Sequence, residues 1–157
     1  MGQPAARVGD FVSHAAPPVL GPGPGSTNVI IGGMPAWRAV PAGTVLPDPP
    51  PEEPPEPEEP PEGEEPPSEE EQKEAAAEQQ EAAGEMMKSL GGGADLHTCA
   101  QPSPVPFCVD GPGFVIKGSS TVMINGLPAS RQGDIVQEVL GLPNPISGGC
   151  KTVKIGG

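Results

Sequence analysis

Three short runs of mostly branched aliphatic residues, each followed by glycine or asparagine-glycine, recur along a chain that is otherwise rich in turns. They lie at residues 29–31, 122–124 and 153–155. Branched aliphatic side chains favour extended strands. The first two runs lead into Gly32-Gly33 and Asn125-Gly126, and both positions of a two-residue hairpin turn need the positive φ that such residues tolerate. The pattern therefore predicts small units made of a strand, a tight turn and a short return strand.

A second pattern, Pro-Ala-x-Arg, marks the return strands. It occurs at residues 4–7, 35–38 and 128–131, and the first and third copies continue with x-Gly-Asp. Proline fits at the start or the edge of a strand, so each copy suits the opening of a short strand. Because spacing and residue identity recur together, we interpret the chain as built from internal repeats.

Residues 47–93 break this pattern. They contain 15 Glu, one Asp and two Lys, so this segment carries the acidity of a chain whose formal net charge is −13. Pro and Glu dominate residues 47–67, which predicts an extended, solvated chain. From Ser68 onward Ala, Glu and Gln take over. A helix is predicted over residues 68–90, with a capping box at its start and three glycines after its end, and its mostly Ala apolar face would be marginal in isolation.

The acidic segment interrupts the second repeat. Residues 35–38 lack the Gly-Asp that follows the other copies, and Asp95 offers a continuation only after the segment. We therefore interpret residues 1–46 and 94–157 as one folded domain. Residues 47–93 are then an insertion in a surface loop, where additional chain is tolerated.

The composition limits both the core and the partners. With 23 Gly, 25 Pro and 3% aromatic residues, a small fold must depend on backbone pairing, turns and bound metal more than on large side chains. No basic stripe indicates nucleic-acid binding, and no apolar run is long enough for a membrane span. The first residues lack the basic and apolar regions of a signal peptide.

The Pro-Ala-Ala-Arg motif at residues 4–7, the repeated strand-and-turn units and the His-Thr-Cys at residues 97–99 resemble the PAAR-repeat family. The resemblance covers residues 1–46 and 94–157. It implies a mostly β fold, a small cone of short β-hairpin repeats with pseudo-threefold symmetry, here carrying a disordered or partly helical acidic insertion. It also implies a place at the spike tip of a contractile injection machine, either a type VI secretion system or a phage-tail-like particle.

The histidines and cysteines predict a structural metal site, because nitrogen and sulfur ligands around Zn²⁺ can hold a small fold together. In proteins of this family the resemblance implies three His and one Cys. Cys108 stands where a third His is expected, since Cys108 and His14 each precede a Thr of the next repeat by 13 residues. We predict Zn²⁺ ligands, with Cys99 in reserve, at His14, His97, Cys108 and Cys150. The alternative is that the cysteines are small buried apolar residues.

The function implied by the resemblance is mechanical, and no enzyme activity is expected. One copy would cap a trimeric β-helical spike and contact the target membrane transiently. Residues 47–93 would be a solvated spacer or would bind an effector or another particle component. The protein would be made in the bacterial cytoplasm without a signal peptide and would leave the cell in the particle. A small zinc-dependent hydrolase or toxin and a disordered acidic adaptor remain as alternatives, although the sequence has no HExxH motif or phosphate loop.

Overall fold

Short strands and one long helix make up the fold. The computed structural model describes residues 1–14, 16–51 and 66–157. Across these ranges the structure is mostly β with a single helix, as predicted from the sequence. Most of the predicted extended tract, residues 52–65, lies outside the described residues.

The elements follow one another as the repeats require, with the helix between the fourth and fifth strands. Their bounds are β1 Gln3–Ala5, β2 Pro22–Gly23, β3 Ile30–Ile31, β4 Met34–Pro35, α1 Glu69–Leu90, β5 Leu96–Pro102, β6 Val109–Val115, β7 Met123–Ile124, β8 Leu127–Pro128, β9 Ile135–Glu138, β10 Asn144–Pro145 and β11 Cys150–Ile155.

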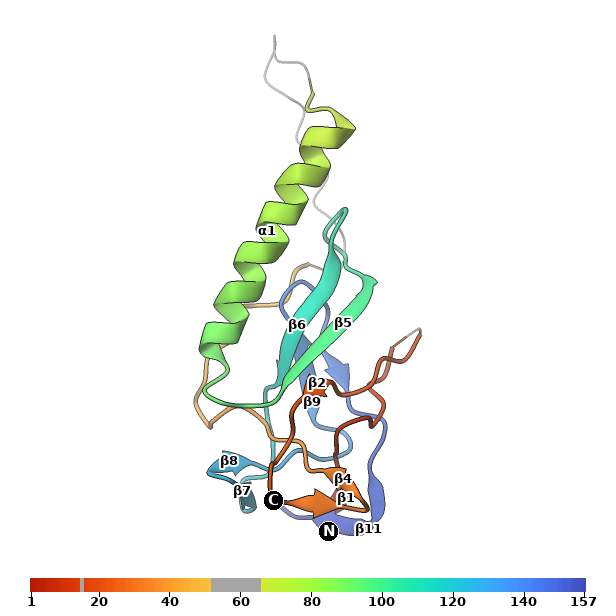
Figure 1. The fold of residues 1–157 in the computed structure, drawn as a ribbon, viewed down its shortest axis with the longest axis vertical. Helices are drawn as coiled ribbons and strands as arrows, with labels where there is room; N and C mark the ends of the chain where they lie inside the picture. The colour runs from red at the N-terminus through yellow and green to blue at the C-terminus, as the bar shows by residue number, and fades with distance from the viewer. Residues whose placement is uncertain (15, 52–65) are drawn as a thin grey trace.

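The strands form one larger sheet and three small ones. The larger sheet has the order β10-β9-β6-β5-β2, and the small antiparallel pairs are β1–β11, β3–β4 and β7–β8. The three pairs gather at one end of the molecule together with both chain termini, while α1 and the β5–β6 hairpin extend toward the other end (Figure 1). The molecule therefore has an end built from the repeats, which we call the base, and an opposite end built from the hairpin and the helix.

The two predicted hairpin turns are present. Gly32 and Gly33 have φ values of 57° and 85°, and Asn125 and Gly126 have values of 52° and 80°. They connect β3 to β4 and β7 to β8. The third pair, β1–β11, has the same antiparallel form but joins the two ends of the chain, with Gln3 opposite Ile155.

The three Pro-Ala-x-Arg copies contact one another in a closed ring of backbone hydrogen bonds. The N–H of Ala6 donates to the carbonyl of Ser130 at 3.0 Å, Ser130 donates to Trp37 at 2.9 Å, and Trp37 donates to Ala6 at 3.0 Å. These are the third residues of the three copies, and all three are buried. Each repeat therefore supplies one donor and one acceptor to its neighbours.

Each copy is also locked by an arginine–aspartate pair. In every pair the arginine backbone N–H donates to Oδ2 of the aspartate, at 2.7–2.8 Å, and Nη2 lies 2.6–3.0 Å from Oδ1. The pairs are Arg7–Asp10, Arg38–Asp95 and Arg131–Asp134. Asp95, reached only after the acidic segment, thus completes the second repeat.

Beneath the ring lies a core of small and branched side chains. Ala5, Ala36 and Ala129, the second residues of the three copies, are each 0% exposed. They pack with isoleucines of the three hairpin strands, namely Ile31, Ile124 and Ile155. Alanine beside the ring allows the three backbones to approach closely, and the isoleucines fill the space that remains.

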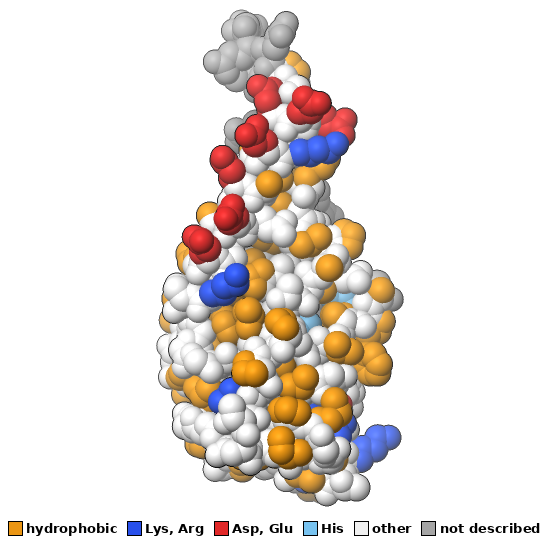
Figure 2. Space-filling model, viewed as in Figure 1, with side chains coloured by type: hydrophobic (Ala, Val, Ile, Leu, Met, Phe, Trp, Pro, Cys, Tyr) orange, Lys and Arg blue, Asp and Glu red, His pale blue; other side chains and the backbone are white. Residues whose placement is uncertain are grey.

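Helix α1 packs against β6 through a separate apolar cluster. Ser68 is the N-cap of the helix, and the side chains of Ser68 and Glu71 form the predicted capping box. Ala76 and Met87 are buried in the cluster, together with Phe114 and Leu140 from the β structure. The acidic side chains of α1 face away from this contact (Figure 2). Among the described residues, no helix has the length and apolar character needed to cross a membrane.

Candidate metal centre

A glycine in the middle of the larger sheet brings His97 and Glu138 together. His97 on β5 lies opposite Gly113 on β6, and Gly113 in turn lies opposite Glu138 on β9. Residues in one such row project toward the same face of a sheet. Because Gly113 has no side chain, the other two meet across it, with His97 Nε2 3.4 Å from Glu138 Oε1.

His97, Cys99 and Glu138 form a fully buried group of metal-ligating side chains, which we call the inner group. Their ligand atoms lie within 4.8 Å of one another, and all three residues are 0% exposed. Neither ring nitrogen of His97 nor either carboxylate oxygen of Glu138 has a hydrogen-bond partner among the described residues. Burial of polar atoms without partners is costly. A metal ion would satisfy these atoms.

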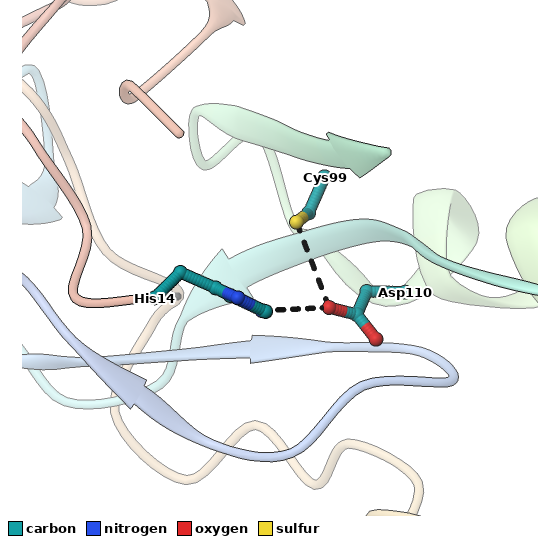
Figure 3. Close-up of side chains that lie close together, drawn as sticks. All are labelled: His14, Cys99 and Asp110. Atoms are coloured by element: carbon teal, nitrogen blue, oxygen red, sulfur yellow. Dashed lines mark hydrogen bonds and ion pairs between the residues drawn. The ribbon is translucent and has the colours of Figure 1, made fainter. Parts of the chain in front are cut away.

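His14, Cys99 and Asp110 form an adjoining group, the outer group, which shares the Cys99 thiol (Figure 3). Asp110 Oδ2 lies 2.8 Å from His14 Nε2 and 3.6 Å from Cys99 Sγ. His14 and Asp110 also line a cavity of about 350 Å³ with Ser103, Leu142 and other residues of the β5–β6 and β9–β10 loops. The outer group is therefore the side of the centre nearest to solvent.

Burial is the main cause of the pKa shifts of Cys99 and Asp110. It raises the pKa of the Cys99 thiol to about 11. It also raises the pKa of Asp110 above its ordinary value, and the hydrogen bond from His14 partly opposes that shift. A divalent cation would counter both effects, because a metal stabilises a thiolate and a carboxylate in their charged forms.

The repeats place three of these side chains at one position. His14, Cys99 and Glu138 are each the fourth residue after the aspartate of the arginine–aspartate pair, at Asp10, Asp95 and Asp134. This spacing is the signal in the sequence that selects Cys99 and Glu138 as site residues. The sequence-based prediction held Cys99 in reserve and did not include Glu138 or Asp110.

Of the four ligands predicted from the sequence, the structure places His97 in the inner group and His14 in the outer group, and the two groups share Cys99. Cys108 lies in the cluster beneath α1, with its Sγ 3.5 Å from the carbonyl oxygen of Ala76. Cys150 lies near the base, 3.2 Å from the Thr152 hydroxyl. Neither belongs to the metal-ligating groups found among the described residues. The set with Cys108 and Cys150 stays a prediction.

The part of the chain that matches a known protein family contains the third repeat. It contains the Pro-Ala-x-Arg copy at residues 128–131, the hairpin β7–β8 and the Arg131–Asp134 pair. Residues 108–157 match the family model of the PAAR motif. The resemblance to PAAR proteins is thereby confirmed for about a third of the chain. No curated protein matches the sequence.

The residues that match the PAAR motif include part of the candidate metal centre. Asp110 and Glu138 lie within the matched residues, whereas His14, His97 and Cys99 come from the chain before them. Imidazole, thiolate and carboxylate are together suitable ligands for a transition metal in a closed structural site. These buried groups could therefore hold a metal ion.

Proposed function

We propose that this protein is the metal-stabilised tip of the spike of a contractile injection machine of the type VI secretion kind. The PAAR motif in residues 108–157 supports this function. The observation that carries it is the closed backbone ring of Ala6, Trp37 and Ser130, in which each of the three repeats donates a hydrogen bond to the next. Three repeats that contact one another in turn would suit a partner with true threefold symmetry.

The base is the surface that would meet the spike. Two of its strand pairs expose an apolar side chain at equivalent positions beside the turns, Ile30 at 56% and Met123 at 55%. Val122 and Val153 are also exposed there. Exposed apolar side chains on short strands favour docking against the strand ends of a β-helical trimer. One copy would then cap three chains, and the molecule would narrow from the base to the opposite end as a cone.

We propose that the metal is Zn²⁺ and that three of its ligands are the inner group, His97, Cys99 and Glu138, with His14 of the adjoining outer group as the fourth. The orphaned polar atoms of His97 and Glu138 and the shared position of His14, Cys99 and Glu138 in the repeats support this set. Zinc bound there would tie the first loop to strands β5 and β9, far from the base. The alternative set replaces Cys99 and Glu138 by Cys108 and Cys150.

The proposed role is mechanical and involves no turnover. A rigid end held by a metal would concentrate force on the target membrane, while the base stays attached to the spike. The protein would be made in the bacterial cytoplasm and leave within the particle. The acidic segment 47–93 would remain on the outside of the tip, as a spacer or as a contact for an effector or another particle component.

The test is co-assembly with a trimeric β-helical spike protein. Native mass spectrometry of the purified complex is expected to give one copy per three spike chains. An equal ratio contradicts the threefold argument. A variant with Ile30→Asp and Met123→Asp is expected to lose the complex while keeping its melting temperature, and Met86→Asp, on the exposed side of α1, serves as the control.

A further inference from the structure

We infer that the outer group, His14, Cys99 and Asp110, binds the metal first and passes it to the inner group, which holds it. This inference rests on the metal centre proposed above and gives a role to Asp110, which the proposed ligand set does not include. Three features of the structure support it: the burial of the inner group, the cavity beside the outer group, and the different hydrogen bonding of the two groups.

The inner group has no direct contact with solvent. His97, Cys99 and Glu138 are each 0% exposed. An ion from solution must therefore pass other side chains before it reaches them, and a metal site inside a folded domain needs a route from the surface.

The cavity beside the outer group supplies such a route. His14 and Asp110 line this cavity of about 350 Å³, and Leu142 and Asn144 form part of its opposite wall. The side chain of His14 is 18% exposed and that of Asp110 is 3% exposed. Exposure thus falls from the cavity toward the fully buried Cys99, and the first imidazole and carboxylate that an ion would meet in this cavity belong to the outer group.

Cys99 connects the outer group to the inner group, because its thiol belongs to both. Within each group the three ligand atoms lie within 4.8 Å of one another. Cys99 Sγ lies 3.6 Å from Asp110 Oδ2, as Figure 3 shows. The Cys99 sulfur can therefore stay bound to the metal while the carboxylate of Asp110 is exchanged for the side chains of His97 and Glu138.

Hydrogen bonding determines which group binds briefly and which group holds the metal. In the outer group, Asp110 Oδ2 lies 2.8 Å from His14 Nε2 and accepts a hydrogen bond from the Cys99 thiol. In the inner group, both ring nitrogens of His97 and both carboxylate oxygens of Glu138 lack hydrogen-bond partners among the described residues. Buried polar atoms without partners are costly, so binding at the inner group removes the larger penalty.

The first test fills the cavity and measures how fast the metal leaves. The Zn²⁺-loaded protein is mixed with an excess of a chromogenic chelator. Leu142→Trp is expected to slow release about tenfold, which corresponds to about 1.4 kcal/mol in the barrier. Uptake should slow by the same factor and leave Kd unchanged, because both directions cross the same barrier. Asn144→Trp fills the cavity from β10 and serves as a second variant, and Val45→Trp, at a position that is 82% exposed and outside the cavity, is the matched control.

The second test uses the direction in which the release rate changes. Asp110→Asn keeps the size of the side chain and removes its charge. It is expected to slow release and uptake about tenfold each, as expected for the loss of one contact with a charged group on the route. Glu138→Gln makes the same chemical change in the inner group and is expected to speed release, because the loss of a resting ligand weakens the bound state.

The outcomes separate this inference from the proposed function. A wild-type protein that binds no Zn²⁺ overturns the metal centre and this inference together. If the wild type binds Zn²⁺ and both cavity-filling variants release it at the wild-type rate, the metal leaves by another route and only this inference fails. Faster release from Asp110→Asn also contradicts it, since Asp110 would then be a resting ligand. Release that accelerates in dilute urea in proportion to the loss of stability would show that the domain must unfold, and would equally exclude the route.

Discussion

Arg38 and Asp95 make the same contact as residues three positions apart in the other repeats, although 57 positions separate them. Arg38 Nη2 lies 2.6 Å from Asp95 Oδ1, and the Arg38 backbone N–H donates to Oδ2 at 2.8 Å. Arg7–Asp10 and Arg131–Asp134 show the same arrangement. The second repeat is therefore complete in space, with the acidic segment leaving and returning between its two halves.

Removal of Arg38 is expected to destabilise the domain strongly. Asp95 is fully buried, so Arg38→Ala leaves an uncompensated buried carboxylate, which costs about 3–5 kcal/mol. Chemical denaturation would measure the change in the free energy of unfolding. Lys73→Ala breaks the exposed Lys73–Glu69 pair and is expected to change stability little. Equal effects of the two substitutions would contradict a structural role for Arg38.

Two neighbouring methionines test whether α1 is part of the folded domain. Met87 is fully buried against the β structure, whereas Met86 is 48% exposed. Met87→Ala is expected to lower the free energy of unfolding by about 2–5 kcal/mol, because it leaves a cavity. Met86→Ala is expected to change it little, since its side chain already contacts water. If both variants unfold like the wild type, the helix does not contribute to the domain.

Cysteine variants distinguish the two ligand sets. Cys99→Ala is expected to reduce Zn²⁺ affinity more than about 100-fold. Loss of a ligand should cost more than loss of a residue that only hydrogen-bonds to a ligand, which costs about 10–100-fold. Cys108→Ala and Cys150→Ala are expected to bind Zn²⁺ as the wild type does. Isothermal titration with Zn²⁺ would measure all three affinities. Loss of binding in the Cys108 and Cys150 variants, with Cys99→Ala unaffected, would instead support the set predicted from the sequence.

Removal of the metal is expected to lower the melting temperature. A ligand that binds only the folded state at 100 times its Kd stabilises that state by about 3 kcal/mol. Melting curves with Zn²⁺ and with excess chelator should therefore differ by several degrees or more. Glu138→Gln keeps the size of the side chain but removes its charge, and its melting should depend much less on chelator. An identical response of Glu138→Gln and the wild type would exclude Glu138 as a ligand.

The two cysteines outside the proposed set are expected to differ in reactivity. Cys108 and Cys150 are similarly inaccessible, at 6% and 8% exposure. The Thr152 hydroxyl lowers the pKa of Cys150, whereas burial raises the pKa of Cys108. At pH 8 more of Cys150 is thiolate, so it should react with iodoacetamide first, and the Cys108 reaction should gain more as the pH rises. Peptide mass spectrometry would give both rates, and faster labelling of Cys108 at pH 8 would contradict this order.

The turns and strands of the base are predictable from the sequence because their signals are local. Gly32-Gly33 and Asn125-Gly126 adopt the positive φ values that their composition favours, and the aliphatic runs supply the strands. The helix is also marked locally, by Ser68 and Glu71 at its start. The face by which the helix packs is not marked in the sequence. Its apolar positions are mostly alanine, and the buried Met87 is directly preceded by the exposed Met86.

The metal centre is harder to predict because it depends on contacts between repeats. Counting back from the next strand aligns Cys108 with His14. That count runs through the seven-residue strand β6, whereas the stretch after His14 contains the two-residue strand β2. Counting forward from the aspartate of each pair selects Cys99 and Glu138 instead. The sequence alone also does not indicate that Glu138 is a site residue. Its contact with His97 depends on Gly113, which lies between them in the sheet and has no side chain.

The pairing of β1 with β11 brings the first and last strands together, as the strands of the two hairpins are brought together. In two hairpins a tight turn joins the strands, and in the third the same place is occupied by residues next to Met1 and Gly157. A short linker between these residues, with a new break at Asn125-Gly126, would give a circularly permuted molecule with the same contacts. Each of the three corners of the base is therefore an equivalent point at which another polypeptide could be attached.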